Sequence, residues 1–281
     1  NHQYMLFFTQ KGKCFWMRVY EIPEGSKNSK GRAIQNLINI EQDDRVKAFI
    51  CTQDLKDEDY VNSNYVIMAT KMGQVKKTSL EQYSRPRSNG INAITIKDGD
   101  ELLEAKLTNG NSQIMLAVQS GKAIRFEESK TRPMGRNASG VRGIRLKDKK
   151  DEVVGMISVN DMDANILVVS ENGFGKRSSL EDYRLTNRGG KGVKTISITE
   201  KTGKLVSLKS VSDNDDLMII NKSGIAIRMQ VEDLRVMGRA TQGVKVISLK
   251  DGDSIAAVAK VMKDDDDLED VNEIEFTGDT V

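Results

Sequence analysis

The chain has 281 residues, with 43 Lys and Arg, 41 Asp and Glu and a single His, for a net charge of +2. No apolar run approaches the roughly 18 residues of a membrane-spanning helix and the N-terminus lacks a signal-peptide pattern, so we expect a cytoplasmic protein with no membrane partner. One histidine and two cysteines argue against a His-based catalytic triad, a metal site and a disulfide framework, so we expect neither catalytic nor metal-binding residues.

A unit of about fifty residues recurs five times, at approximately residues 4–50, 63–108, 112–159, 164–211 and 215–262. Each copy holds a turn glycine and a second glycine, which lie 17 residues apart in the second copy and 19 apart in the other four. The turn glycines are Gly12, Gly73, Gly121, Gly173 and Gly224, and the second glycines are Gly31, Gly90, Gly140, Gly192 and Gly243. Such a period indicates a repeat architecture.

Each copy begins with a short apolar run that leads into the turn glycine and is typical of a β-strand, at residues 4–8, 65–68, 114–116, 166–169 and 217–220. Another strand follows the second glycine, as in 193–198, and a fourth apolar stretch closes the copy, as in 254–258. Four strands per copy predict one blade per copy, and the five copies predict an all-β, propeller-like ring over residues 1–263. A helical solenoid is disfavoured because no copy keeps a period of 3.6 residues.

The two signs of charge are separated along the chain. Residues 264–281 contain nine acidic residues and no basic one, which leaves 43 basic against 32 acidic residues in 1–263 and a net charge of +11 there. The acidic segment is expected to be a disordered tail, either a solvated end that aids solubility or a competitor for a basic surface. A basic body with an acidic tail is typical of nucleic-acid binders.

The basic residues of the body form three columns in register with the glycines. The first column stands four residues after the turn glycine, at Lys77, Arg125, Arg177 and Arg228. Lys76 and Lys176 directly precede two of these residues. The first copy has Trp16 at this position and Arg18 two residues later. A second column precedes the second glycine, at Arg87, Arg136, Arg188 and Arg239. A third follows it, at Arg32, Arg142, Lys194 and Lys245, whereas the second copy has Asn92.

Equivalent positions lie at equivalent places on successive blades, so these columns predict a ring of positive charge around the rim. Double-stranded DNA carries one negative charge per roughly 1.7 Å of its axis, and it is the ligand we expect to bend around such a rim. The alternative explanation is that these basic residues only protect exposed strand edges from aggregation. Such residues would not need to keep register with the repeat. Replacing the first column by alanine is expected to weaken DNA binding and to leave the fold intact.

The loop at residues 186–192, Thr-Asn-Arg-Gly-Gly-Lys-Gly, is the most distinctive local motif. Gly189, Gly190 and Gly192 would let backbone amides approach an anion, while Arg188 and Lys191 supply positive charge. The loop is therefore a candidate phosphate contact.

Segments 19–24, 73–78, 139–146 and 172–177 together resemble the C-terminal domain of the DNA gyrase A protein, a β-pinwheel that usually has six blades. The resemblance covers essentially the whole body. It implies a domain that wraps double-stranded DNA in a right-handed sense and biases strand passage toward negative supercoiling. It also implies an A2B2 assembly of the gyrase A and gyrase B proteins on the chromosome. The active-site tyrosine, ATP and magnesium would belong to other parts of that enzyme, with no cofactor in this domain.

The family's seven-residue box, Gln-Arg-Arg-Gly-Gly-Lys-Gly, is matched from Arg188 to Gly192, whereas Thr186 and Asn187 depart from it. The family carries this box in its first blade, but here it stands in the fourth of five copies. The chain also begins without methionine. We therefore expect a piece of a longer protein that starts after the first blade, with an open ring and a monomeric isolated domain.

Two alternatives remain. One is the related C-terminal domain of the topoisomerase IV protein, which would bind DNA with little wrapping. The other is a protein-interaction propeller that binds no nucleic acid. The box-like loop and the acidic tail favour gyrase over the first, and the basic columns disfavour the second.

Overall fold

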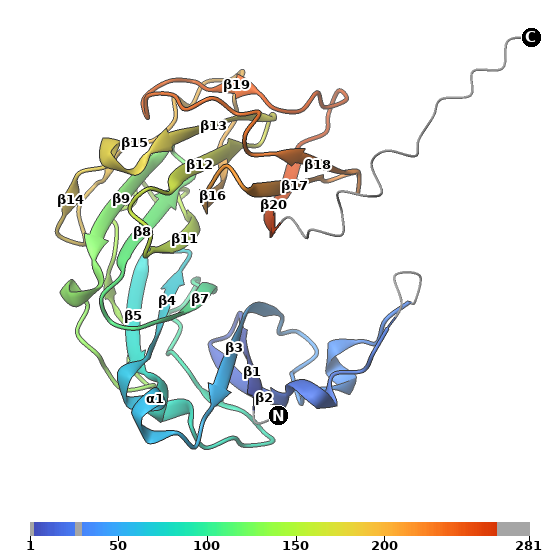
Figure 1. Cartoon of the computed structure of the whole chain (residues 1–281), viewed down its shortest axis with the longest axis vertical. Helices are drawn as coiled ribbons and strands as arrows, with labels where there is room; N and C mark the ends of the chain where they lie inside the picture. The colour runs from blue at the N-terminus through green and yellow to red at the C-terminus, as the bar shows by residue number, and fades with distance from the viewer. Residues whose placement is uncertain (1–2, 26–29, 263–281) are drawn as a thin grey trace, which may run out of the picture.

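The computed structural model describes residues 3–25 and 30–262. The acidic segment 264–281 lies outside the described residues, so the prediction of a disordered tail stays a prediction. Five small β-sheets, here called blades 1 to 5 in chain order, follow an arc that forms an open ring (Figure 1). The prediction of an all-β, propeller-like ring is confirmed. Within the described ranges, no helix is long and apolar enough to cross a bilayer.

A β-hairpin forms the centre of each blade. The hairpins are β1 (Gln3–Thr9) and β2 (Lys13–Arg18), β4 (Tyr65–Thr70) and β5 (Gln74–Ser79), β8 (Gln113–Val118) and β9 (Lys122–Glu127), β12 (Asn165–Ser170) and β13 (Phe174–Ser179), and β17 (Asp215–Asn221) and β18 (Ala226–Gln230). The five turn glycines have φ between 79° and 86°. This left-handed conformation is accessible to glycine at little cost, which explains the spacing of the first glycine series.

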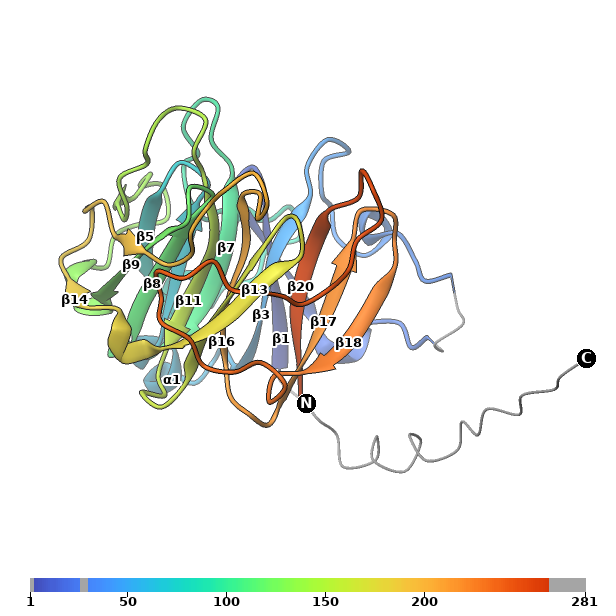
Figure 2. The same cartoon turned by 90° about the horizontal axis from the view of Figure 1, so that it is seen from above.

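The inner strands are β3 (Val46–Asp54), β7 (Leu102–Thr108), β11 (Val153–Val159), β16 (Leu205–Val211) and β20 (Ile255–Met262), each antiparallel to the first hairpin strand of its blade. The first hairpin strands of the middle blades face a neighbouring blade on both sides, so their apolar residues alternate between two cores. Ile67 packs with blade 3, for example, whereas Met68 packs with blade 1. Figure 2 shows the blades stacked side by side around the ring.

The outer strand of a blade comes from the next copy of the repeat. These strands are β6 (Ile91–Asn92), β10 (Val141–Arg142), β15 (Val193–Lys194) and β19 (Val244–Lys245), and they pair with β2, β5, β9 and β13 of the preceding blade. The prediction that each copy supplies all four strands of its own blade is therefore wrong. A Cβ on Gly192 would lie 2.5 Å from the carbonyl oxygen of Ala123, so the second glycine lets the crossing chain approach the preceding blade.

Blades 3 and 5 depart from the four-stranded pattern. Blade 3 carries an additional parallel strand, β14 (Leu185–Thr186), on β9. Blade 5 has only three strands, in the order β18-β17-β20, among the described residues. The remaining elements are α1 (Glu58–Ser63) and short 3-10 turns η1 (Val19–Glu21), η2 (Ile34–Asn36), η3 (Leu80–Tyr83), η4 (Glu128–Lys130) and η5 (Leu180–Asp182).

Candidate nucleic-acid interface

Most of the first basic column is buried, together with the lysines that precede it. The fractional exposure is 0% for Lys76 and Lys176, 5% for Lys77, 7% for Arg177 and 8% for Arg125. The expectation that these five side chains form an exposed rim is wrong. They lie on the second hairpin strand, which the outer strand covers on one side and the neighbouring blades cover on both faces.

The buried cations connect each blade to the next copy of the repeat. Arg125 on β9 donates through Nη1 to the carbonyl oxygens of Leu180 and Tyr183, both at 2.9 Å; Leu180 begins the turn η5 and Tyr183 follows it. Arg177 on β13 donates through Nε to the carbonyl oxygen of Leu234, which stands where Tyr183 does in the fourth copy. Leu180 O also accepts from Tyr183 N at 3.1 Å within the turn, whereas the carbonyls of Tyr183 and Leu234 are satisfied by the buried donor from the neighbouring blade.

Lys77 meets the corresponding turn of the third copy through a carboxylate. Its Nζ lies 3.6 Å from Oε1 of Glu128, a fully buried residue at the start of η4, and 4.9 Å from the centre of the Tyr65 ring. Glu128 also accepts from the hydroxyl of Thr108 at 2.6 Å. The register of this column with the repeat thus reflects the way in which blades are joined.

Trp16 of the first copy performs the role of the missing basic residue. Its indole Nε1 donates to the carbonyl oxygen of Tyr83 at 2.9 Å, in the place where Arg125 donates to Tyr183. The first copy therefore departs from the column in residue type and keeps the hydrogen bond. At this position of the first copy, an uncharged indole donor thus reaches the turn carbonyl that a guanidinium reaches in the third copy.

Lys76 and Lys176 hold the loops that lead to the next second glycine. Lys76 Nζ donates to the carbonyl oxygens of Ala93 and Arg136, both at 2.5 Å, and Lys176 Nζ donates to the carbonyl oxygen of Gly238 at 2.6 Å. Burial disfavours a charged amine and lowers the pKa of Lys76 to about 7 and that of Lys176 to about 8.

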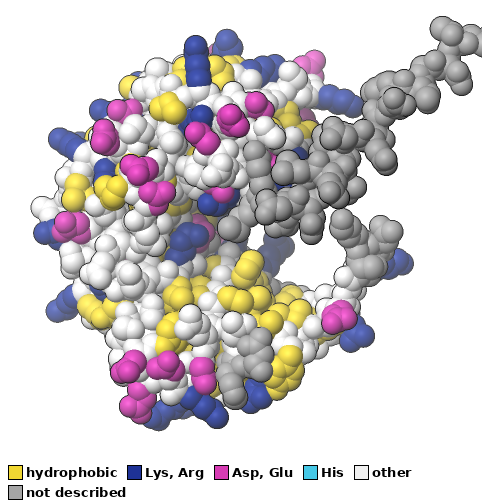
Figure 3. All heavy atoms as spheres, in the orientation of Figure 1, with side chains coloured by type: hydrophobic (Ala, Val, Ile, Leu, Met, Phe, Trp, Pro, Cys, Tyr) yellow, Lys and Arg dark blue, Asp and Glu magenta, His cyan; other side chains and the backbone are white. Residues whose placement is uncertain are grey.

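The second and third columns lie at the outer edge of the blades and reach solvent. Arg87, Arg142, Lys194 and Lys245 are exposed, and Arg136, Arg188 and Arg239 are partly exposed. Arg142, Lys194 and Lys245 end the short outer strands β10, β15 and β19. Lys and Arg side chains project at many points around the outline of the molecule in Figure 3.

Contacts between consecutive copies place these two columns side by side. Arg188 Nη1 donates to the carbonyl oxygen of Arg142 at 3.0 Å, and Arg239 Nη1 donates to the carbonyl oxygen of Lys194 at 2.8 Å. A second-column arginine therefore lies next to the third-column residue of the preceding copy. Together the two columns place cations along the outer edges of blades 2 to 4, which we call the basic path: Arg136, Arg142, Arg188, Lys194, Arg239 and Lys245.

A further basic column escaped the sequence analysis. Eight residues before the second glycine stand Arg132, Arg184 and Arg235, and all three are exposed. In the shorter second copy, Arg85 and Arg87 line a surface pocket together with Arg136 of the third copy. The constant offset from the second glycine was the available signal.

The box-like loop is attached to the preceding copy of the repeat. Gly189 N donates to the carbonyl oxygen of Gly143 at 2.6 Å, and Gly190 accepts from Arg145 N at 2.8 Å, so these glycines are partly committed to structure. Lys191 and Gly190 both line a small pocket with Arg184, and Lys191 is exposed. The loop thus presents positive charge beside the basic path, whereas Gly189 N is not available to an anion.

The two remaining predicted residues lie on the outside of the first and last blades. Arg18, at the end of β2, donates to the hydroxyl oxygens of Tyr20 at 2.6 Å and Tyr4 at 3.1 Å and is exposed. Arg228 on β18 is exposed and donates to Oδ2 of Asp216 at 2.6 Å. Neither belongs to the basic path.

The fold and this surface define a class of protein, a propeller-type β ring in which consecutive repeats exchange strands and display cations at the outer edge. Comparison with known proteins identifies the family within this class. The family model described as "DNA gyrase C-terminal domain, beta-propeller" matches residues 3–53, 64–109, 113–160, 164–212 and 215–262. The chain belongs to this family.

Curated relatives that are gyrase A proteins include one from Staphylococcus epidermidis, 43% identical over 267 residues, covering 95% of this chain and 29% of the relative. Another, from Staphylococcus aureus, is 44% identical over 283 residues, covering 100% of this chain and 31% of the relative. The chain therefore spans less than a third of the length of these relatives, which are components of a type II topoisomerase.

Two solved structures share the fold. The C-terminal domain of DNA topoisomerase IV superposes with a TM-score of 0.84, and the DNA gyrase A C-terminal domain with a TM-score of 0.78, each at 25% identity. The matches cover 93% of this chain in both cases, with 80% of the topoisomerase IV chain and 83% of the gyrase chain.

Proposed function

We propose that this domain binds double-stranded DNA along the basic path and bends the duplex around the outer edge of the ring. The contacts between consecutive copies carry this proposal, since they place Arg188 beside Arg142 and Arg239 beside Lys194 and so bring the two exposed columns together at successive blades. A bent duplex presents phosphates in such a series, and the counterions released on contact favour binding. The cost of bending, of order 1–6 kcal/mol for 20–30 base pairs, is distributed over several blades.

In the whole enzyme, this domain is a non-catalytic part of the gyrase A protein, within an A2B2 assembly that acts on the bacterial chromosome in the cytoplasm. Wrapping DNA in a right-handed sense biases ATP-dependent strand passage toward negative supercoils. The active-site tyrosine, ATP and magnesium act in other domains, and this domain uses no cofactor. Family membership and the gyrase A relatives support this assignment.

A variant of the basic path tests DNA binding directly. Replacing Arg142, Arg188, Lys194 and Arg239 by glutamine removes four cations that support no buried contact. The slope of log affinity against log salt concentration should fall by about 3–4, since each lost phosphate contact lowers it by roughly 0.9. A matched control removes four lysines from exposed turns away from the path, Lys97, Lys149, Lys222 and Lys250.

Electrophoretic retardation of a short duplex at several salt concentrations provides the measurement. The path variant should bind more weakly and with a shallower slope than the control, which carries the same net charge. Equal affinities and slopes for both variants would show that DNA does not follow the basic path.

DNA binding without wrapping, as expected of a topoisomerase IV type domain, is the second candidate. The TM-score of 0.84 to that domain favours it. Ligation of nicked circles in the presence of the domain separates the two. A change in linking number after removal of the protein indicates wrapping, whereas retardation of DNA with an unchanged linking number indicates binding alone.

A further inference from the structure

Two loops of the basic path each contact a buried lysine of the preceding blade. The loop that carries Arg136 contacts Lys76, and the loop that carries Arg239 contacts Lys176. Both lysines are 0% exposed, so they lie behind the loops and cannot meet DNA themselves. Their register with the repeat therefore needs an explanation other than a phosphate contact.

The sequence links these lysines to one kind of loop. Both loops read Met-Gly-Arg, then three residues and the second glycine, at 134–140 and 237–243. The lysine position lies three residues after the turn glycine, and it is Phe15 in the first copy and Ile124 in the third. The loops that cross those two positions belong to the second and fourth copies and lack Met-Gly-Arg. Lysine and Met-Gly-Arg thus occur together on neighbouring copies, which indicates one structural unit.

Each Met-Gly-Arg segment forms a tight turn with the arginine at its second position. In the third copy, Ala138 N donates to Gly135 O at 3.1 Å. In the fifth copy, Thr241 N donates to Gly238 O at 3.2 Å. These bonds join the first and fourth residues of a β-turn. The methionine amide attaches both turns to the preceding blade at 2.8 Å, from Met134 N to Lys77 O and from Met237 N to Arg177 O.

The lysine supplies a further donor to each turn from the interior. Lys76 Nζ donates to the carbonyl oxygen of Arg136 at 2.5 Å. Lys176 Nζ donates to the carbonyl oxygen of Gly238 at 2.6 Å and to Oγ1 of Thr241 at 3.2 Å. Because the lysine is buried, an apolar replacement would leave these oxygens without that donor, and the turn would have to shift to recover a partner. The placement of the arginine therefore depends on the lysine.

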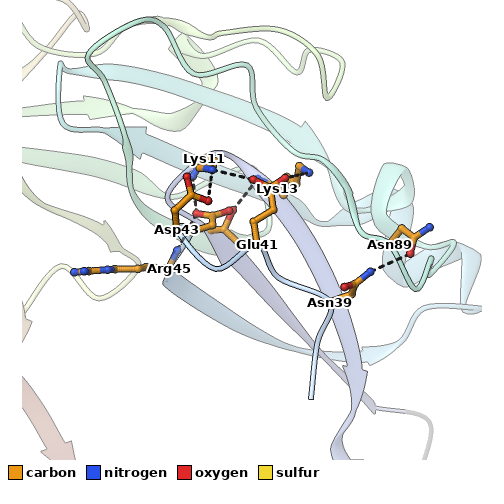
Figure 4. A network of polar contacts seen from close by, with 9 residues as sticks. Lys11, Lys13, Asn39, Glu41, Asp43, Arg45 and Asn89 are labelled. Carbon is orange, nitrogen blue, oxygen red and sulfur yellow. Dashed lines mark hydrogen bonds and ion pairs between the residues drawn. The ribbon is translucent and has the colours of Figure 1, made fainter. Parts of the chain in front are cut away.

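The loops that lack a lysine are fixed in other ways. In the fourth copy, Arg188 holds its own position by donating to two backbone carbonyls. In the second copy, Asn89 accepts from Nδ2 of Asn39 at 3.2 Å, and the ion pair of Lys13 with Glu41 at 2.9 Å holds the segment that carries Asn39 (Figure 4). The buried lysine is thus a feature of the Met-Gly-Arg loops in particular.

We propose that Lys76 and Lys176 are positioning residues for DNA binding, each of which fixes the turn that displays Arg136 or Arg239 to the duplex. This inference rests on the proposed function, because it assigns a task only if DNA follows the basic path. A cation held in place before binding loses less conformational freedom when it meets a phosphate. A turn that shifts would take its arginine out of line with the phosphates and lose that contact.

The two lysines should not contribute equally. In the third copy, Oε1 of Gln82 also accepts from Arg136 N at 3.2 Å, and Oγ1 of Thr95 donates to Asn137 O at 2.7 Å. These bonds remain when Lys76 is removed and keep much of the turn in place. We therefore expect a larger loss of DNA affinity from Lys176→Met than from Lys76→Met.

Lys176→Met tests the proposal, with Arg125→Met as the matched control. Methionine fills the space of the lysine stem, and Ile124 shows that the fold accepts an apolar residue at this position. Arg125→Met also removes one buried positive charge that binds carbonyls of the next copy, but it touches neither Met-Gly-Arg turn. In electrophoretic retardation of a short duplex, the slope of log affinity against log salt should fall by about 0.9 for Lys176→Met and stay unchanged for the control.

A double-mutant cycle with Arg239→Gln separates positioning from a general loss of structure. If Lys176 acts through Arg239, Lys176→Met should weaken DNA binding when Arg239 is present and have no further effect in Arg239→Gln. The crossed pair of Lys76→Met and Arg239→Gln should instead show additive losses, because these residues belong to different turns. Circular dichroism confirms that each variant is folded at the temperature of the assay.

Thr241→Val keeps the test decisive if Lys176→Met does not fold. Thr241 is exposed, and its replacement removes an acceptor of Lys176 while the lysine stays in place. This variant, too, should weaken DNA binding only when Arg239 is present. Unchanged DNA affinity in the variants that fold, or equal losses with and without Arg239, would overturn the positioning role alone. Unchanged affinity in Arg239→Gln by itself would overturn this part of the basic path and the positioning role with it.

Discussion

Replacing Arg125 by methionine separates the structural role of the first basic column from DNA binding. The side chain donates to Oε1 of Gln113 at 2.6 Å and to the carbonyl oxygens of Leu180 and Tyr183 at 2.9 Å. Methionine preserves much of the packing of the aliphatic stem, but it has no donor. The turn η5 of the fourth copy would then lose these side-chain hydrogen bonds from blade 3.

The expected loss of stability follows from the carbonyl of Tyr183, which is left without a donor, whereas Leu180 O keeps its hydrogen bond from Tyr183 N. Each buried, unsatisfied group costs about 1–3 kcal/mol. Part of this loss is offset because the buried guanidinium no longer has to be desolvated, a penalty that is visible in the lowered pKa of Arg125. We therefore expect the free energy of unfolding to fall by about 1–3 kcal/mol, a substantial fraction of the ~5–15 kcal/mol typical of a domain.

Urea unfolding followed by circular dichroism provides the assay, with Arg142→Met as the matched control. Arg142 is exposed, so its replacement should change stability by less than about 0.5 kcal/mol and weaken DNA binding instead. Arg125→Met, measured where it is still folded, should retain the DNA affinity of the wild type. Equal stabilities for the two variants would refute the assignment of Arg125 to the joint between blades.

Further predictions concern a hydrogen bond, a glycine and the two buried lysines. Trp16→Phe removes one half-buried donor and should lower the free energy of unfolding by about 1 kcal/mol, measured in urea. Gly192→Ala, at φ 71° and against a backbone oxygen, should destabilise the domain by about 1–3 kcal/mol, whereas Gly190→Ala has room for its methyl group and should not. Lys76 and Lys176 have lower pKa values when folded than unfolded, so folding releases protons above about pH 7 and pH 8 respectively. Stability should therefore rise from pH 7 toward pH 10, by up to about 1.4 kcal/mol per pH unit for each lysine.

Controls for these predictions come from the chain itself. The rise with pH should shrink in Lys76→Met, and an unchanged pH profile in that variant would contradict a neutral Lys76. Equal melting temperatures for the Gly192 and Gly190 variants would contradict the close approach to blade 3. Full stability of Trp16→Phe would show that the indole hydrogen bond does not replace the arginine of the other copies.

The sequence by itself determined the repeat, the hairpins and the family. Turn glycines need a left-handed backbone, and short apolar runs on either side of them form strands, so both leave a local signal in the chain. The offset of Arg142, Lys194 and Lys245 from the second glycine likewise identified part of the basic path before any contact was known.

Only the tertiary structure decided which blade a strand joins and which cations reach solvent. The pairing of Lys13 with Asn92 connects residues of different copies, and no local preference encodes that choice. Lys76 and Lys77 are neighbours on a strand covered on both faces, so the usual alternation of buried and exposed residues is absent there. Both kinds of cation keep register with the repeat in the sequence. Some are buried and bind carbonyl oxygens of the next copy, whereas others are exposed and available to a phosphate. Only the packing around each side chain in the folded domain distinguishes them.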